Sequence, residues 1–281
     1  MSKPLVIFHA GCTDGFCAAW VARRRLGDCD FLPANYGDEP PDVDGREVFI
    51  LDFSYKRSML NQMVGKARTL VLCDHHKTAA AELAEFYSTN SATIDTITRN
   101  QGDTYCIFDM NRSGGRLAWD FFFPNKLRSW LVDYTEDRDL WRWNLPASRE
   151  INACLASWPR TFVDWDKLGL DEIARDELVS FSEQGSAILR YQQQMVDGAC
   201  ANAVEIEMNG HKVLSTNATM LISEIGQQLS KDRPFSATFF ILPTGKKVWS
   251  LRSQVEGGLD VSEIAKLHGG GGHRNAAGFT E

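Results

Sequence analysis

The chain has 281 residues, which at about 150 residues per domain predicts two domains, each large enough to bury a hydrophobic core. Hydrophobic residues make up 43% and charged residues 24%, a composition that excludes disordered, collagen-like and simple fibrous proteins. Asp and Glu number 37 against 30 Lys and Arg, a net charge of −7, which argues against a large surface for long duplex nucleic acid. A short anionic ligand in a local basic pocket is still compatible with this charge.

The cysteines and the apolar runs predict the cellular setting. Seven cysteines are scattered without a repeated spacing, a pattern that favours reduced thiols over a disulfide framework. The first residues lack the length and cleavage site of a signal peptide, and no stretch reaches the roughly 18 apolar residues of a membrane span. We therefore expect a cytoplasmic protein without a membrane partner.

Strands and helices alternate in the first half of the chain. Apolar runs predict strands at 5–8, 30–33, 47–53 and 69–74, and helical spacing follows the first of them at 16–26 and the third at 55–64. A further buried helix is expected at 113–123. This alternation implies right-handed crossovers and a parallel sheet that is covered on both faces. The fold class predicted is therefore α/β.

Polar residues follow the carboxyl ends of these strands, where ligands bind in parallel sheets. They are His9, Asp14, Asp52 and the cluster 74–76. Carboxylates mixed with imidazoles suit Mn²⁺, or Mg²⁺ as a weaker alternative, better than a thiolate zinc site does. Two such ions about 3.5–4 Å apart can clamp the attacking and departing oxygens of a phosphoryl transfer. Asp52, alone at the end of its strand, is the natural carboxylate to bridge them.

The second half of the chain has a different order of elements. Residues 171–196 are polar with helical spacing and predict a connector helix, after which 203–216 predict a hairpin. A helix at 223–230, strands at 236–242 and 247–251, a helix at 261–267 and the tail GGGGHRNAAGF complete the chain. We predict a catalytic domain at 1–165, a connector at 166–200 and a smaller mixed α/β domain at 201–281.

Two motifs carry a resemblance to a known family. DHH at 74–76, preceded by an apolar strand, is similar to the name-giving motif of the DHH phosphoesterase superfamily, and GGGGHRNAAGF resembles the signature of its partner DHHA1 domain. HAGCTDGFCAAW, ILDFS and SLRSQVEGGLDVSEIAKLHGGGGH occur in the family's order, so the resemblance spans essentially the whole chain. It implies a parallel-sheet DHH domain joined by a connector helix to a DHHA1 domain.

The resemblance implies roles for single positions. His9 resembles a ligand of the first metal and Asp14 one of the second, while Asp52 matches the ligand of both. His75 is similar to the metal-binding histidine, and His76 to the one beside the scissile phosphate. By the same comparison, Asp74 positions these histidines.

The remaining carboxylate and the first motif leave alternatives open. A fourth motif places one more carboxylate on the second metal, and Asp137 is our first choice, with Asp139 as the fallback and Asp133 less favoured. The first motif usually reads Asp-x-Asp-Gly, but here Cys12 stands in place of the first Asp. Cys12 either binds the first metal and shifts its preference toward Fe²⁺ or Zn²⁺, or stays out and leaves that site weak. It can equally be a small loop residue.

The DHHA1-like tail predicts the substrate clamp. Successive glycines allow backbone N–H groups to approach an anion closely. The resemblance implies that one set of residues grips the nucleotide end away from the scissile bond: Arg252, Ser253, Gly271, Gly272, His273 and Arg274.

These expectations converge on an enzyme of short substrates. We predict a phosphodiesterase with two divalent ions, Mn²⁺ first and Mg²⁺, Co²⁺ or Fe²⁺ as alternatives. Its substrates would be short oligoribonucleotides or linear dinucleotides such as pGpG or pApA, cleaved to mononucleotides, because the acidic chain offers no evident groove for long strands. The alternatives are a 3′-phosphoadenosine 5′-phosphate phosphatase and a non-catalytic nucleotide-binding sensor. A homodimer is compatible with the sequence.

Overall fold

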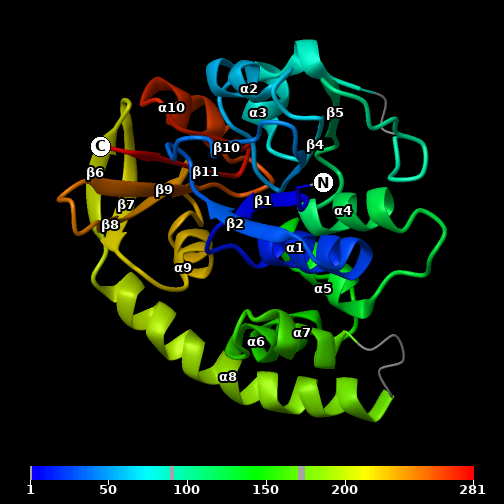
Figure 1. The fold of residues 1–281 in the computed structure, drawn as a ribbon. Helices are drawn as coiled ribbons and strands as arrows, with labels where there is room; N and C mark the ends of the chain where they lie inside the picture. The colour runs from blue at the N-terminus through cyan, green and yellow to red at the C-terminus, as the bar shows by residue number, and fades with distance from the viewer. Residues whose placement is uncertain (1, 89–91, 170–174) are drawn as a thin grey trace. The chain divides into compact units, whose positions relative to one another are not determined.

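The computed structural model of the chain describes residues 2–88, 92–169 and 175–281. It divides into two compact units, Met1–Ile188 and Leu189–Glu281, and the division lies inside one long helix, α8 (Arg175–Ala201) (Figure 1). The predicted connector is therefore helical from residue 175 onward, whereas its residues 170–174 lie outside the described part. The predicted domain boundaries at 165 and 200 stay predictions.

The first unit contains a five-stranded sheet in the order β2-β1-β3-β4-β5. Every pair of neighbouring strands is parallel, as the alternation of elements predicted. The central strands are buried on both faces, which explains their continuous apolar runs. The strands are β1 (Leu5–His9), β2 (Asp30–Ala34), β3 (Glu47–Leu51), β4 (Thr69–Asp74) and β5 (Asp103–Phe108).

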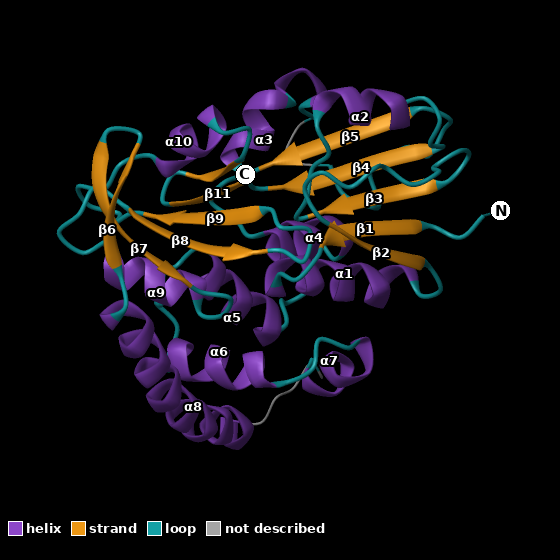
Figure 2. Ribbon diagram, turned by 90° about the vertical axis from the view of Figure 1, so that its left-hand side faces the viewer, coloured by secondary structure: helices purple, strands orange, loops and turns teal. Residues whose placement is uncertain are grey.

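Helices cover both faces of this sheet (Figure 2). One face packs against α1 (Thr13–Leu26) and α4 (Gly114–Phe122), whose apolar side chains share a core with Phe49 and Val71. The other face packs against α2 (Arg57–Met63), through Leu60 and Met63, and α3 (Lys77–Glu82) lies on the same side. The remaining elements of the unit are a 3₁₀ turn (Ala84–Phe86), α5 (Trp130–Asp139), α6 (Ser148–Ser157) and α7 (Phe162–Leu168).

The second unit contains a six-stranded sheet in the order β10-β11-β9-β8-β7-β6. Its pairs are antiparallel except for β7 with β8, which are parallel. Helix α10 (Val261–Leu267) packs on one face through Val261 and Ile264, and α9 (Ile222–Leu229) covers the opposite face (Figure 2). The strands are β6 (Val204–Met208), β7 (His211–Asn217), β8 (Ser236–Ile241), β9 (Lys247–Arg252), β10 (Gly271–His273) and β11 (Ala276–Thr280).

The mixed α/β character of the second unit and its first hairpin, β6 with β7, agree with the expectation from sequence. The glycine-rich tail, for which no strand was predicted, forms a further hairpin, β10 with β11. A side chain at Gly272 would place its Cβ 2.6 Å from the Ala276 carbonyl oxygen. Glycine at this position is therefore required by the close approach of the two strands.

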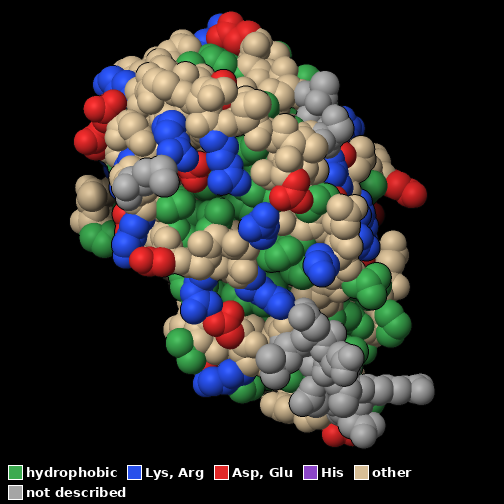
Figure 3. Space-filling view, turned by 45° about the vertical axis from the view of Figure 1, so that its right-hand side comes forward, with side chains coloured by type: hydrophobic (Ala, Val, Ile, Leu, Met, Phe, Trp, Pro, Cys, Tyr) green, Lys and Arg blue, Asp and Glu red, His purple; other side chains and the backbone are tan. Residues whose placement is uncertain are grey.

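The surface and the thiols complete the description of the fold. No helix within the described ranges is long and apolar enough to cross a membrane. All seven cysteines belong to those ranges and are free thiols. On the face drawn in Figure 3, Lys and Arg side chains stand in small groups between apolar and acidic side chains.

Candidate metal centre

Three adjacent strands deliver the predicted polar residues to one edge of the first sheet. His9 is the last residue of β1, Asp52 directly follows β3, and Asp74 ends β4. Strand β3 pairs with β1 on one side and with β4 on the other. Because all three strands are parallel, their carboxyl ends meet at the same edge. This order places Asp52 between His9 and the DHH motif.

Asp52 directs its two oxygens toward different histidines. Oδ1 lies 3.1 Å from His75 Nε2, and Oδ2 lies 3.6 Å from His9 Nδ1. The residue is 1% exposed, and neither oxygen has a hydrogen-bonding partner among the described residues. Its backbone adopts φ 54° while its N–H donates to the Cys73 carbonyl at 2.9 Å, which fixes the turn after β3. A buried carboxylate needs a positive charge beside it, which a bound cation or a protonated histidine can supply.

Two of the groups of potential ligand atoms at this edge are placed to hold a pair of ions, and the atoms within each group lie within 4.8 Å of one another. One group consists of His9, Cys12 and Asp52, and the other of Asp14, His75 and Asp139. Asp52 contacts a histidine of each group, which is the position that a bridging carboxylate needs. The carboxylates and imidazoles present therefore fit a pair of divalent cations.

Asp14 is held by the beginning of helix α4. Its Oδ2 accepts a hydrogen bond of 2.5 Å from the Gly114 N–H, and its Oδ1 accepts one of 3.0 Å from the Gly115 N–H. Both are among the unpaired donors that every helix has at its start. They also place the positive end of the helix dipole against a buried carboxylate. Ser113 caps the same helix by accepting from the Arg116 N–H.

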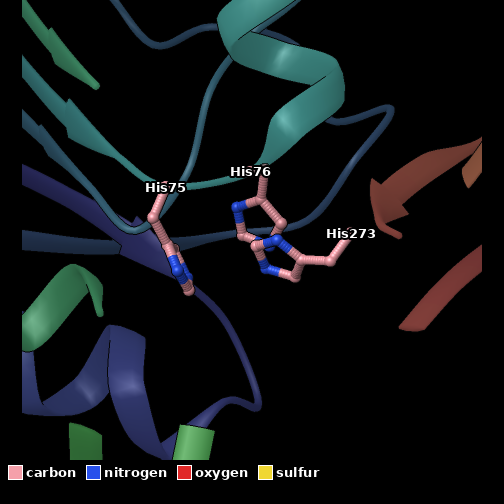
Figure 4. Close-up of side chains that lie close together, drawn as sticks. All are labelled: His75, His76 and His273. Atoms are coloured by element: carbon pink, nitrogen blue, oxygen red, sulfur yellow. The ribbon is translucent and has the colours of Figure 1, made fainter. Parts of the chain in front are cut away.

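Asp74 organises the DHH motif. Its Oδ1 lies 2.7 Å from His76 Nδ1 and also accepts from the backbone N–H groups of both histidines. Its Oδ2 accepts a 2.6 Å hydrogen bond from the Ser54 hydroxyl. In Figure 4, the rings of His75 and His76 follow one another beyond β4, with their centroids 4.9 Å apart. His273, also labelled there, belongs to the second unit and is described with it.

The pKa values of the site follow from burial and from the neighbouring charges. Burial alone would raise the pKa of Asp74, but the charge and hydrogen bond of His76 outweigh it and lower the value to about 2. Asp74 in turn raises the pKa of His76 against the effect of burial. Asp14 differs, because burial and the charges of Asp139 and Asp52 raise its pKa well above the usual range. Asp74 and His76 thus stabilise each other's charged forms, whereas burial and two neighbouring carboxylates disfavour the charged form of Asp14.

For the fourth carboxylate, the geometry favours Asp139, the fallback, over Asp137, our first choice. The structure brings Asp139, not Asp137, to the donor atoms, with Oδ2 of Asp139 3.6 Å from His75 Nε2. Asp137 instead accepts hydrogen bonds from the Asn144 and Leu145 N–H groups, at 2.9 and 3.2 Å. Two residues along a helix correspond to about 200° of rotation, so the two side chains leave α5 on nearly opposite sides. Asp133 forms a 2.7 Å ion pair with Arg128.

Several residues of the site are absent from the sequence-based prediction. The Gly114–Gly115 pair and Ser54 are described above, and Tyr36 is the third case. The Tyr36 ring packs edge-on against His9 and His76, with centroids 5.4 and 6.1 Å apart, while 58% of the residue is exposed. Tyr36 follows the carboxyl end of β2, so the rule that located His9 could also have located it.

In the second unit, strand register brings the predicted clamp residues together. Arg252 on β9 pairs with Ala276 on β11, and Ala276 pairs with His273 on β10. With strands about 4.8 Å apart, Arg252 and His273 lie roughly 10 Å from each other across the sheet. Ser253 and Arg274 are their immediate neighbours in the chain, so these residues occupy one end of the sheet, with Gly271 and Gly272 on β10.

The clamp residues differ in what their side chains contact. The Arg252 guanidinium donates to the Ser223 hydroxyl at 3.0 Å, and burial lowers its pKa to about 10. Ser253 is buried and donates to the Leu259 carbonyl at 2.7 Å. Its hydroxyl also accepts from Asn275. Arg274 has a side chain that is 58% exposed and lies 3.7 Å from Asp260. Ser253 thus holds the loop, whereas Arg274 reaches the surface.

Comparison with known proteins gives relatives of limited overlap. No family model matches the sequence. The chain is 28% identical over 300 residues to an uncharacterized protein of Acanthamoeba polyphaga mimivirus, covering 98% of this chain and 66% of that protein. It is 41% identical over 75 residues to oligoribonuclease NrnB of Bacillus subtilis, covering 27% of this chain and 18% of NrnB. The chain thus spans less than two thirds of the length of either relative.

A solved structure gives the fold. The DHH domain of a protein described as belonging to a family of ribosomal proteins superposes with a TM-score of 0.55 at 12% identity, covering 98% of this chain and 82% of that one. At this identity the likeness concerns the arrangement of the chain. The protein therefore has the fold of this DHH domain, which is the fold that its DHH motif predicted.

Proposed function

We propose that this protein is a metal-dependent phosphodiesterase that hydrolyses short oligoribonucleotides or linear dinucleotides, such as pGpG or pApA, to mononucleotides. The observation that carries the proposal is the position of Asp52, whose buried oxygens approach one histidine from each of two donor groups. The 41% identical segment shared with an oligoribonuclease supports the choice of substrate class. The proposed ions are Mn²⁺, with Mg²⁺, Co²⁺ or Fe²⁺ as alternatives.

The residues that would hold the ions are those of the two donor groups. His9 and Asp52 would bind the first ion, and Asp14, His75, Asp139 and Asp52 the second. When bound, such a pair of divalent ions lowers the pKa of a water and offsets the charge that develops on the phosphoryl oxygens. The N–H groups of Gly114 and Gly115 at the helix start would keep the Asp14 carboxylate in place beside the second ion.

His76 would act on the phosphate itself. Its Nδ1 lies against Asp74, which orients the ring and raises its pKa, so that the protonated form is favoured. We assign to Nε2 the contact with the scissile phosphate. In the reaction, water adds to phosphorus, the bond to the leaving ribose oxygen breaks, and that oxygen takes up a proton. A protonated His76 would stabilise the departing charge or supply that proton.

The second unit would grip the other end of the substrate. Arg252, His273 and Arg274 lie at one end of its sheet, and an arginine fork matches the oxygens of a phosphate. The N–H groups of Gly271 and Gly272 would approach the same phosphate. Ser253 would contribute by holding the adjacent loop rather than through its hydroxyl.

The proposal is tested with a substrate panel on one preparation in Mn²⁺. The panel holds a 5′-phosphorylated dinucleotide, a longer RNA, single-stranded DNA and 3′-phosphoadenosine 5′-phosphate. We expect the dinucleotide to be cleaved to mononucleotides with the highest kcat/KM of the panel. His76→Ala should lose this activity, whereas the surface control Asp133→Asn should keep it. Release of inorganic phosphate alone would indicate the phosphatase. Tight nucleotide binding without turnover in Mn²⁺, Co²⁺ or Fe²⁺ would indicate a sensor.

A further inference from the structure

The loop between β1 and α1 places Cys12 beside two of the proposed metal ligands. Its sulfur, a ring nitrogen of His9 and an oxygen of Asp52 all lie within 4.8 Å of one another. Two hydrogen bonds hold this loop directly before Cys12. The Ala10 N–H donates to the Ala34 carbonyl at 2.9 Å, and Arg160 donates to the Gly11 carbonyl at 2.6 Å. Cys12 directly precedes helix α1 as its N-cap residue, and its carbonyl accepts from the Phe16 N–H at 3.2 Å.

A second observation indicates that this group is built for a cation. Both oxygens of Asp52 and Nδ1 of His9 are buried without a hydrogen-bonding partner in the described ranges. Asp52 is 1% exposed, so water does not compensate its charge. Asp14, the other acidic residue of the same motif, does not fill this position, because its donor atom lies in the other group, with His75 and Asp139. The sulfur of Cys12 is therefore the third donor of the group.

The donors of the two groups differ in chemical softness. The group of Asp14, His75 and Asp139 offers two carboxylates and one imidazole, which suit Mn²⁺ or Mg²⁺. The group of His9, Cys12 and Asp52 offers sulfur, nitrogen and oxygen, and thiolate ligands favour Fe²⁺, Co²⁺ and Zn²⁺ over Mn²⁺ and Mg²⁺. On binding, the thiol releases its proton to solvent as the metal–sulfur bond forms.

We propose that Cys12 is a thiolate ligand of the first metal position, so that this position selects Fe²⁺, Co²⁺ or Zn²⁺ while the second accepts Mn²⁺. The protein would then hold an unlike pair of ions. This inference rests on the metal-dependent part of the proposed function, but it concerns metal binding and not the substrate. It can therefore be tested without any measurement of turnover.

The test is an anaerobic titration of the metal-free protein with Co²⁺, followed by absorption spectroscopy. We expect a near-ultraviolet thiolate-to-cobalt charge-transfer band that saturates at one Co²⁺ per chain, although two ions bind. In Cys12→Ser the band is lost and the Co²⁺ affinity of that position falls at least about tenfold. Even the loss of a residue that only hydrogen-bonds to a ligand can lower metal affinity by this much. In Cys12→Asp the band is also lost, two ions still bind, and the preference of the first position moves toward Mn²⁺.

Cys29→Ser is the matched control, because Cys29 lies beyond the other end of α1 and its thiol donates to the Gly27 carbonyl at 3.6 Å. This variant keeps the band. The proposal is overturned if wild-type protein binds Co²⁺ without the band, binds no Co²⁺ at all, or keeps the band in Cys12→Ser. A protein that shows the band but cleaves no nucleotide in the substrate panel would overturn the proposed function and leave this inference standing.

Discussion

The backbone N–H of Gly114 donates a hydrogen bond of 2.5 Å to Oδ2 of Asp14, a residue 100 positions earlier in the chain. A helix start thus serves as the partner of a buried carboxylate that the proposed metal centre needs. The same glycine lies directly against Asp52, because a Cβ at this position would be 2.4 Å from the Asp52 Cβ. Two of the proposed metal ligands are therefore positioned by one glycine.

Gly114→Ala is expected to disturb the metal centre. The added methyl group must displace Asp52, and overpacking of this kind costs about 1–3 kcal/mol of the free energy of unfolding. We expect weaker metal binding at both positions, measured by calorimetric titration. Gly198→Ala is the control, since a Cβ at this exposed helical position meets nothing within 4 Å. That change should stabilise α8 by up to about 1 kcal/mol and leave metal binding unchanged.

Asp139→Asn and Asp137→Asn are expected to behave in opposite ways. Asp139 lies beside His75, so its loss should remove one of two bound ions and lower kcat by roughly a hundredfold, or about 3 kcal/mol of transition-state stabilisation. Asp137 binds two backbone N–H groups instead. Its variant should lose about 1–2 kcal/mol of stability and keep both ions. Metal analysis and urea unfolding of the two proteins distinguish these roles, and the reverse pattern would restore Asp137 as the ligand.

Ser54→Ala is expected to act on catalysis through Asp74 and His76. The Ser54 hydroxyl donates a 2.6 Å hydrogen bond to the Asp74 carboxylate, which in turn orients His76. Loss of this charge-assisted bond should lower kcat about tenfold while KM changes little, because the orientation of His76 matters most in the transition state. Ser54→Thr keeps the hydroxyl and should restore most of the rate. A rise in KM with an unchanged kcat would argue against this positioning role.

Removal of the metal ions is expected to destabilise the first unit. Buried carboxylates of Asp14 and Asp52 lose their compensating charge when a chelator removes the ions. An ion present at about a hundred times its Kd contributes about 2.7 kcal/mol to stability. Urea unfolding with Mn²⁺ and with chelator should therefore differ in midpoint for wild type, and by a smaller amount for Asp139→Asn, which is expected to keep one ion. Equal midpoints for wild type in both conditions would show that no ion binds the folded chain.

The clamp residues of the second unit separate into two kinds by their contacts. Arg274→Ala removes an exposed guanidinium, so it should raise KM for a 5′-phosphorylated dinucleotide about tenfold with little change in stability. Ser253→Ala removes a buried hydroxyl that bonds Leu259 and Asn275, so it should cost about 1–2 kcal/mol of stability. Steady-state kinetics and thermal unfolding of both variants check this contrast. An unchanged KM in Arg274→Ala would remove Arg274 from the proposed clamp.

Much of the fold was predictable because strong local patterns report local structure. The apolar runs of β1, β3 and β4 and the spacing of α1 predicted these elements within a few residues. Strand β5 carries the mixed sequence DTYCIF and was not predicted. The short helices α6 and α7 and the hairpin of the glycine-rich tail were missed for the same reason. Contacts with neighbouring strands and helices, rather than their own sequence patterns, decide the structure of these elements.

The sequence by itself determined which kinds of candidate ligand the protein has, since a carboxylate or imidazole at the end of a buried parallel strand can be recognised from local pattern alone. Only the tertiary structure decided which of them meet. The order β1-β3-β4 sets Asp52 between His9 and His75, and the return of the chain through α4 brings Gly114 to Asp14. The rotation of α5 selects Asp139 over Asp137. These choices depend on contacts between residues far apart in the chain, which a local pattern does not contain.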